Sequence, residues 1–220
     1  MIKAIIFDFD GIILESAGIK TEAFKELFSD FPTKIKQIID YHLLNAGISR
    51  YIKFKYIYEN ILGRELTKEK EAELAEQFSQ ITLQKVLNAP FVAGAREFLD
   101  KNQKRYQFFI ASGTPEHELR NIIKLRQLKD YFKEVYGSPN EKRDIINEIM
   151  KKYHFSRDEV VYVGDSQSDR LAANKARIVF VERENNTYIK SKSRSWVVRD
   201  LLDLNKILEK IENSNSTEGN

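Results

Sequence analysis

Apolar residues follow two different patterns along the chain, and the change between them divides it into parts. Residues 3–8 form a short continuous apolar run, which is typical of a buried strand. From about Thr21 to Leu87 the apolar residues recur at helical spacing instead. The helical segments lie near 21–29, 33–46, 49–62 and 67–87. This stretch is therefore predicted to be an all-helical block inserted between strand-bearing regions.

After Pro90 short apolar runs alternate with helical segments. The expected strands cover 107–111, 134–136, 159–163, 178–181 and, at a sheet edge, 196–198. The expected helices cover 94–102, 115–125, 140–153, 168–176 and 201–211. Strands that alternate with helices predict an α/β fold, in which a mostly parallel sheet is covered by helices on both faces.

The predicted domain organisation follows from these patterns. A Rossmann-like core is expected over residues 1–17 and 89–212, with a helical cap domain inserted over residues 18–88. Residues 213–220 are polar and are expected to be a disordered tail.

Composition narrows the class of protein but does not identify it. The 220 residues are 42% apolar and 31% charged, and the formal charge of +3 is too small to indicate a nucleic-acid partner. The chain has no cysteine, which excludes disulfides and thiolate metal sites. Neither a cleavable leader nor an apolar run of the ~18 residues needed to span a membrane is evident. A cytoplasmic protein without a membrane partner is expected.

Acidic residues gather where the predicted strands end. Asp8 and Asp10 follow the first strand, and Asp165 and Asp169 follow a later one. Ligands of parallel sheets bind at the carboxyl ends of the strands, so these carboxylates are expected to share one site. Oxygen ligands without a His or Cys cluster favour Mg²⁺ over zinc.

Groups suited to an anion occur at the same edge. Ser112 and Gly113 follow a strand and precede a helix N-terminus, where a hydroxyl and free N–H groups suit a phosphate. Lys142 lies early in the helix expected over 140–153, from which it can reach the same end of the sheet. Together with the carboxylates, these residues predict a magnesium-assisted phosphoryl site.

These motifs resemble those of the haloacid dehalogenase superfamily. Asp8-Phe9-Asp10-Gly11 with Ser16 resembles its first motif, DxDGxxxxS, and Gly164 to Asp169 resembles its fourth, GDxxxD. Ser112-Gly113 and Lys142 resemble the second and third, in the family's order. The helical block resembles the cap of the phosphoglycolate phosphatase and β-phosphoglucomutase branch. The resemblance implies a strand order of 5-4-1-2-3.

The resemblance also implies roles. Asp8 would be the nucleophile that forms an aspartyl-phosphate, and Asp10 the general acid and base. The ligands of Mg²⁺ would be the side chains of Asp8 and Asp165 and the backbone carbonyl of Asp10, with Asp169 supporting the ion directly or through its neighbours. The phosphoryl oxygens would be bound by Ser112, Gly113 and Lys142.

Three basic residues are candidates for substrate specificity. Lys20 stands where β-phosphoglucomutases carry a histidine, which disfavours a mutase. Arg50 and Lys53 are three residues apart and share a helix face, from which they could bind an anionic group of the substrate. An ordinary solvated basic face is an equal alternative. Runs similar to this one occur in acylneuraminate phosphatases.

The function expected from these motifs is a magnesium-dependent phosphatase. Its substrate would be a small phosphorylated metabolite: a sugar phosphate, a sugar-acid phosphate or a compound like phosphoglycolate. A β-phosphoglucomutase-like mutase is the alternative reaction. A non-catalytic binding or regulatory module on the same fold is the alternative class. Either a monomer or a homodimer fits the sequence.

Overall fold

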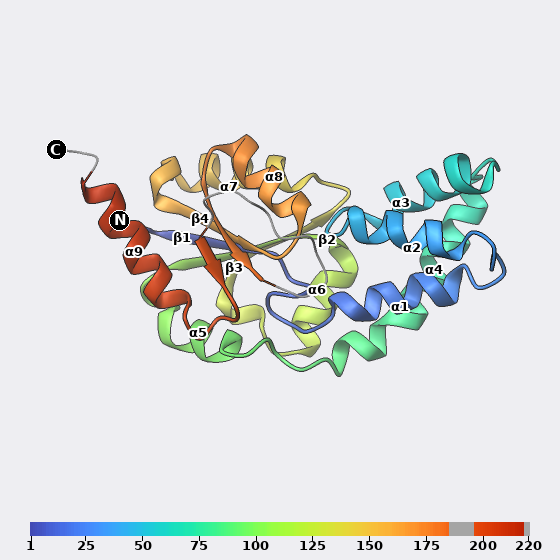
Figure 1. The fold of residues 1–220 in the computed structure, drawn as a ribbon. Coiled ribbons are helices and arrows are strands. Elements are labelled where there is room, and N and C mark those ends of the chain that lie inside the picture. The colour runs from blue at the N-terminus through green and yellow to red at the C-terminus, as the bar shows by residue number, and fades with distance from the viewer. Residues whose placement is uncertain (185–195, 218–220) are drawn as a thin grey trace.

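The computed structural model describes residues 1–184 and 196–217, which form a sheet-containing core and a helical cap (Figure 1). All strands of the core pair in parallel, in the order β3-β2-β1-β4-β5-β6. The strands are β1 (Ala4–Phe7), β2 (Gln107–Pro115), β3 (Phe132–Ser138), β4 (Val160–Gly164), β5 (Val179–Arg183) and β6 (Trp196–Val198). The first strand is therefore central, and both of its neighbours end beside it.

The predicted α/β class is confirmed, and the strand order differs only at one edge. Read from the opposite edge, the first five strands follow the expected order 5-4-1-2-3. A sixth strand, β6, pairs with β5 and extends the sheet, at the position where residues 196–198 were expected to form an edge strand.

Alternation along β1 explains why helices cover both faces of the sheet. Ile5 and Phe7 belong to one apolar cluster, with α5, α6 and α9. Ala4 and Ile6 belong to a second cluster on the other face, with α7 and α8. All four side chains are fully buried, as a central strand of a doubly covered sheet requires. The core helices are α5 (Ala95–Asn102), α6 (Glu116–Leu125), α7 (Lys142–Tyr153), α8 (Gln167–Ala176) and α9 (Leu204–Thr217), with short 3₁₀ turns at Lys129–Tyr131 and Arg157–Glu159.

The cap is a separate layer of helices at one end of the core (Figure 1). It comprises α1 (Ala17–Leu27), α2 (Ile35–Leu44), α3 (Arg50–Tyr56), a π-helical turn η1 (Ile57–Leu62) and α4 (Lys68–Leu87). Its own apolar cluster contains Phe24, Phe28, Phe54 and Phe78, all at most 2% exposed. The cap therefore has a core of its own and is not an extension of the sheet domain.

The two connections between cap and core run side by side. The Glu15 N–H donates to the Pro90 carbonyl at 2.9 Å, and the Val92 N–H donates to the Ile13 carbonyl at 3.1 Å. These bonds hold the start and end of the cap together, directly after the first acidic motif. No helix within the described ranges is both long and apolar enough to cross a bilayer.

Two local predictions were wrong. The expected disorder over residues 213–220 is contradicted up to Thr217, because α9 continues to that residue. Leu208 and Ile211 bury the inner face of this helix, which continues over the polar residues 213–217. Residues 218–220 lie outside the described residues. Strand β2 also runs to Pro115, four residues beyond the prediction, and pairs there with Ser138.

Candidate active site

The two acids of the first motif lie just beyond the end of β1. The strand ends at Phe7, and the Asp8 N–H still donates to the Val163 carbonyl at 2.9 Å. Gly11 follows with a φ of 78°, a left-handed conformation that glycine adopts without strain. The chain turns away at this residue, which leaves Asp8 and Asp10 at the edge of the sheet that faces the cap.

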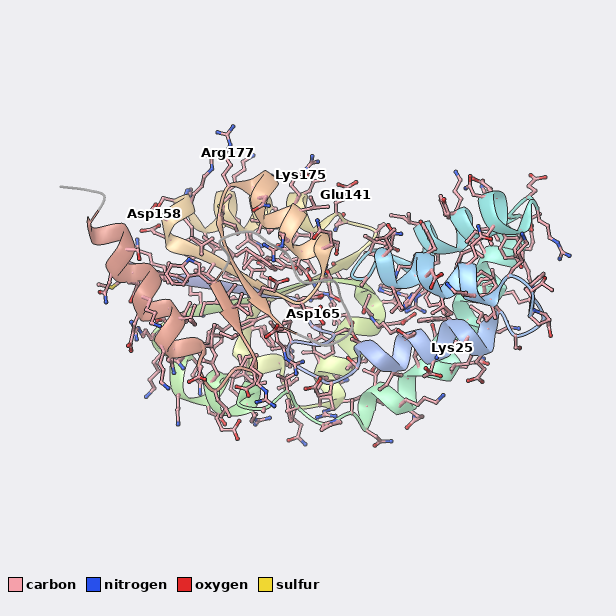
Figure 2. All side chains as sticks on the ribbon, in the orientation of Figure 1. Lys25, Glu141, Asp158, Asp165, Lys175 and Arg177 are labelled. Atoms are coloured by element: carbon pink, nitrogen blue, oxygen red, sulfur yellow. The ribbon has the colours of Figure 1, made fainter. Side chains whose placement is uncertain are left out.

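Asp8 lies within a compact group of charges. Its carboxylate is 2.9 Å from Lys142 Nζ, which also donates to Asp169 Oδ1 at 2.6 Å. Oxygens of Asp8, Asp165 and Asp169 all lie within 4.8 Å of one another, and each of these residues is buried. In Figure 2 the labelled Asp165 lies on the side of the core that faces the cap. The predicted metal-binding carboxylates are thus brought together.

The raised pKa values of Asp8 and Asp165 indicate that the cluster is short of positive charge. Burial raises the pKa of Asp8 to about 7; Lys142 opposes this shift, and Asp169 and Asp10 add to it. Burial, with the charges of Asp8 and Asp169, raises the pKa of Asp165 well above its usual range. A divalent cation would supply the missing charge, and an all-oxygen donor set is the kind that Mg²⁺ prefers. The residues present therefore fit this ion.

Asp169 has its oxygens already engaged by protein donors. Oδ1 accepts from Lys142 and from the Tyr162 hydroxyl at 3.0 Å, and Oδ2 accepts from the Ser166 N–H at 3.0 Å and the Ser166 hydroxyl at 2.6 Å. This carboxylate is placed to orient Lys142 and the loop that carries Asp165. Of the two roles expected for Asp169, these contacts favour support through its neighbours.

Asp10 is held by a separate set of donors. Ser16 Oγ donates to Oδ1 at 2.7 Å and Thr114 Oγ1 donates to Oδ2 at 2.9 Å, while Lys20 forms an ion pair with Oδ2. Burial would raise the pKa of Asp10, but the Lys20 ammonium and these hydrogen bonds outweigh it and lower the pKa below the usual value. Asp10 and Asp8 therefore differ in protonation behaviour although they are two residues apart.

The residues of the second motif, which are predicted to bind phosphate, line the same cavity. Ser112 is 1% exposed, and its hydroxyl accepts from the Thr114 N–H at 3.2 Å. The cavity has a volume of about 60 Å³ and is also lined by Asp8, Asp10, Asp165 and Gly113. A Cβ at position 113 would lie 2.5 Å from the Gly47 carbonyl oxygen, so cap and core are in contact here.

Gly47 places the cap directly on the active site. Its φ is 78°, and an added Cβ would lie 2.5 Å from Ser166 Oγ and 3.1 Å from Lys142 Nζ. Only a residue without a side chain fits between these groups. The sequence pattern marks Gly47 as a helix break and gives no sign of this contact.

The three candidate specificity residues have different environments. Lys20 contacts Asp10 and donates to Thr114 Oγ1 at 2.6 Å. Arg50 forms an ion pair with Glu118 of α6 and donates to Ser79 Oγ at 2.9 Å. Arg50 and Lys53 are only 6% and 3% exposed, so the alternative of a solvated basic face is wrong.

Several residues around the site were not identified from the sequence. Thr114 donates a hydrogen bond to Asp10, and its position directly after Ser112-Gly113 could have identified it as a site residue. Tyr162 lies inside a buried strand, and His42 and Glu118 lie on helices. Nothing in their local pattern separates them from ordinary packing or surface residues, because their contacts connect elements far apart in the chain.

Curated proteins match most of the chain. A phosphoglycolate phosphatase of Vibrio vulnificus strain YJ016 is 28% identical over 188 residues, which cover 80% of each chain. A phosphoglycolate phosphatase of Vibrio cholerae is 24% identical over 186 residues, 80% of this chain and 81% of the relative.

Solved structures share the fold. A β-phosphoglucomutase from Clostridium difficile superposes with a TM-score of 0.79 at 20% identity, over 98% of this chain and all of the other. A protein described as a predicted phosphoglycolate phosphatase from Haemophilus somnus has a TM-score of 0.75 at 19% identity, over 94% and 98% of the two chains. The family described as haloacid dehalogenase-like hydrolase matches residues 5–182. The chain belongs to the haloacid dehalogenase-like hydrolase family.

Proposed function

We propose that the chain is a magnesium-dependent phosphatase that hydrolyses a small phosphorylated metabolite through an aspartyl-phosphate on Asp8. The observation that carries the proposal is the pairing of Asp8 with Lys142 and with the carboxylates of Asp165 and Asp169, at the wall of a small cavity. Curated relatives named phosphoglycolate phosphatase, which match 80% of the chain, support the same reaction class.

Mg²⁺ would be held by the side chains of Asp8 and Asp165 and by the backbone carbonyl of Asp10. Bound there, it would neutralise charge on the carboxylates and on the phosphoryl oxygens. It would also lower the pKa of Asp8, which burial raises to about 7, and so favour the ionised nucleophile at neutral pH.

Asp8 would attack the phosphorus atom. A bond forms between its carboxylate oxygen and phosphorus as the bond from phosphorus to the leaving oxygen breaks. Ser112, the Gly113 N–H and Lys142 would bind the phosphoryl oxygens and stabilise their charge in the transition state. Lys142 is suited to this because Asp8 and Asp169 keep it charged: they raise its pKa although burial opposes them.

Asp10 would transfer protons. It would give one to the leaving oxygen in the first step and take one from the water that attacks the aspartyl-phosphate in the second. The second step requires the ionised carboxylate, which is the state that Lys20, Ser16 and Thr114 stabilise. The cap would exclude bulk water during both steps, since Gly47 already contacts the phosphate-binding residues.

The test is a metabolite screen with purified protein. Phosphate release should require Mg²⁺, stop with EDTA and be lost in Asp8→Asn. Product analysis by ³¹P NMR with a hexose 1-phosphate separates hydrolysis from isomerisation, so a new phosphorylated sugar without free phosphate would establish the mutase instead. Lack of turnover on every ester, with ligand binding unchanged by Asp8→Ala, would indicate a non-catalytic module and contradict the proposal.

A further inference from the structure

Two of the three cap cations near the cavity are neutralised by carboxylates. Lys20 is paired with Asp10, and Arg50 is paired with Glu118. Arg50 is further occupied by Ser79 Oγ at 2.9 Å and by the Phe78 ring, whose centroid is 4.6 Å from its guanidinium carbon. Neither side chain has spare charge with which to bind a substrate.

Lys53 differs from both of them. It lines the cavity beside Asp8 and Asp10 and is 3% exposed. Its Nζ lies 3.2 Å from His42 Nδ1 and 3.4 Å from the His42 carbonyl oxygen, and 5.5 Å from the centre of the Phe24 ring. In the part of the chain that the structure describes, Lys53 forms no ion pair with a carboxylate. It is a buried ammonium with neutral partners only.

His42 orients this ammonium. Its Nε2 lies 3.2 Å from Thr21 Oγ1, to which it can donate, and this leaves Nδ1 as the acceptor for Lys53. Burial, together with the charges of Lys53 and Lys20, lowers the pKa of His42 to about 2, so the ring is neutral. An ammonium has three N–H donors, and His42 accepts two of them. One donor, and the charge of the protonated amine, are left for a ligand in the cavity.

A buried, unpaired charge is costly unless it has a partner in some functional state. Burial, with the charges of Lys20 and Lys142, lowers the pKa of Lys53 to about 7. A methionine or glutamine would fill the same space without this cost. The position is therefore better explained by a ligand than by packing.

We propose that Lys53, oriented by His42, binds a carboxylate of the substrate, so that the enzyme acts on small phosphorylated carboxylic acids. This inference deepens the proposed phosphatase function and rests on it. A single ammonium matches the single charge of a carboxylate better than the nearly double charge of a second phosphate. The cavity of about 60 Å³ favours a carboxylate only a few bonds from the phosphoryl group.

The experiment compares two esters that differ only in the carboxylate: 2-phosphoglycolate and 2-hydroxyethyl phosphate. Their dissociation constants are measured by calorimetry with Mg²⁺ in the Asp8→Asn protein, and their kcat/KM values in the active enzyme. A charge-assisted hydrogen bond predicts that the acid binds roughly 10–100-fold more tightly. Lys53→Met should reduce this preference to less than about threefold.

The matched control is Lys55→Met, which removes an exposed lysine from the same helix and should leave the preference intact. Thermal melts establish that each variant is folded, and Lys53→Gln replaces Lys53→Met if the latter does not fold. Three results would each overturn the proposal. The protein that retains Lys53 could bind the two esters with equal affinity, the preference for the acid could survive both substitutions at Lys53, or binding of phosphoglycolate could be undetectable. If neither ester is turned over, the metabolite screen decides the phosphatase function, and the binding ratio in the Asp8→Asn protein still decides the role of Lys53.

Discussion

The buried ammonium of Lys53 should make the free protein less stable near pH 7 than near pH 9, and Lys53→Met should remove this dependence. Folding lowers the pKa of Lys53 from 10.5 to about 7, chiefly through burial and then through the charges of Lys20 and Lys142. Between these two values the unfolded chain binds the proton more tightly, so stability rises with pH in this window. One pKa unit corresponds to about 1.4 kcal/mol, and integration from pH 7 to pH 9 gives about 2 kcal/mol.

The measured quantity is the difference in free energy of unfolding between Lys53→Met and the wild type. Subtraction removes the contributions of Lys20 and Lys142, which both proteins retain, and His42 stays neutral throughout, since its pKa is about 2. The difference should favour the methionine variant at pH 7 and fall by about 2 kcal/mol at pH 9. Urea unfolding followed by circular dichroism reports on the helical cap, in which Lys53 lies.

The control for this measurement is again Lys55→Met, because its side chain is exposed on the same helix. Its stability difference from the wild type should be nearly independent of pH. A difference for Lys53→Met that is constant from pH 7 to pH 9, or that grows with pH, would refute the reasoning. It would mean that Lys53 keeps its proton in the folded state throughout this range, because a compensating partner offsets its burial.

Four further predictions concern the site and the cap. Asp8→Asn should lower kcat at least about a thousandfold in a phosphate-release assay, because the attacking carboxylate is lost. Mg²⁺ should raise the melting temperature of the wild type and not that of Asp165→Asn, since an ion bound by native carboxylates stabilises the folded state; an equal rise in both would contradict this metal site. Glu118→Gln should leave Arg50 buried without its charged partner, destabilise closure of the cap by about 2 kcal/mol or more, and speed hydrogen exchange in α3. Gly47→Ala should lower kcat/KM at least about tenfold, because its Cβ would meet Ser166 Oγ at 2.5 Å; unchanged kinetics would show that the cap does not close as described.

The core and its site were largely predictable because their signals are local in the chain. A strand that is buried on both faces must be a continuous apolar run, as in Ala4–Phe7, and the acids that end it stand out against that run. Parallel pairing brings the ends of β1, β2 and β4 to one edge, so the strand-end residues must meet there. The edge strand β6 was expected, but its addition to the sheet order depends on pairing with β5, which no local pattern specifies.

The supporting contacts could not be predicted in the same way. Tyr162 donates to Asp169, and Thr114 donates to Asp10 across 104 positions of the chain. Such bonds depend on which strands are neighbours and how far each one extends. The extension of β2 to Pro115 is an example, since it places Thr114 beside Asp10 although the apolar run ends at Ala111.

Arg50 and Lys53 show why spacing alone did not distinguish two basic residues on one helix. Their separation of three positions puts them on one face, and the structure buries both. What separates them is the partner: α6 of the core presents Glu118 to Arg50, whereas α2 of the cap presents only a neutral histidine to Lys53. The first arrangement is complete without a ligand and holds the cap to the core. If Lys53 binds the substrate as we propose, an anion in the cavity would complete the second arrangement, and the charge that folding leaves unpaired would contribute to substrate binding.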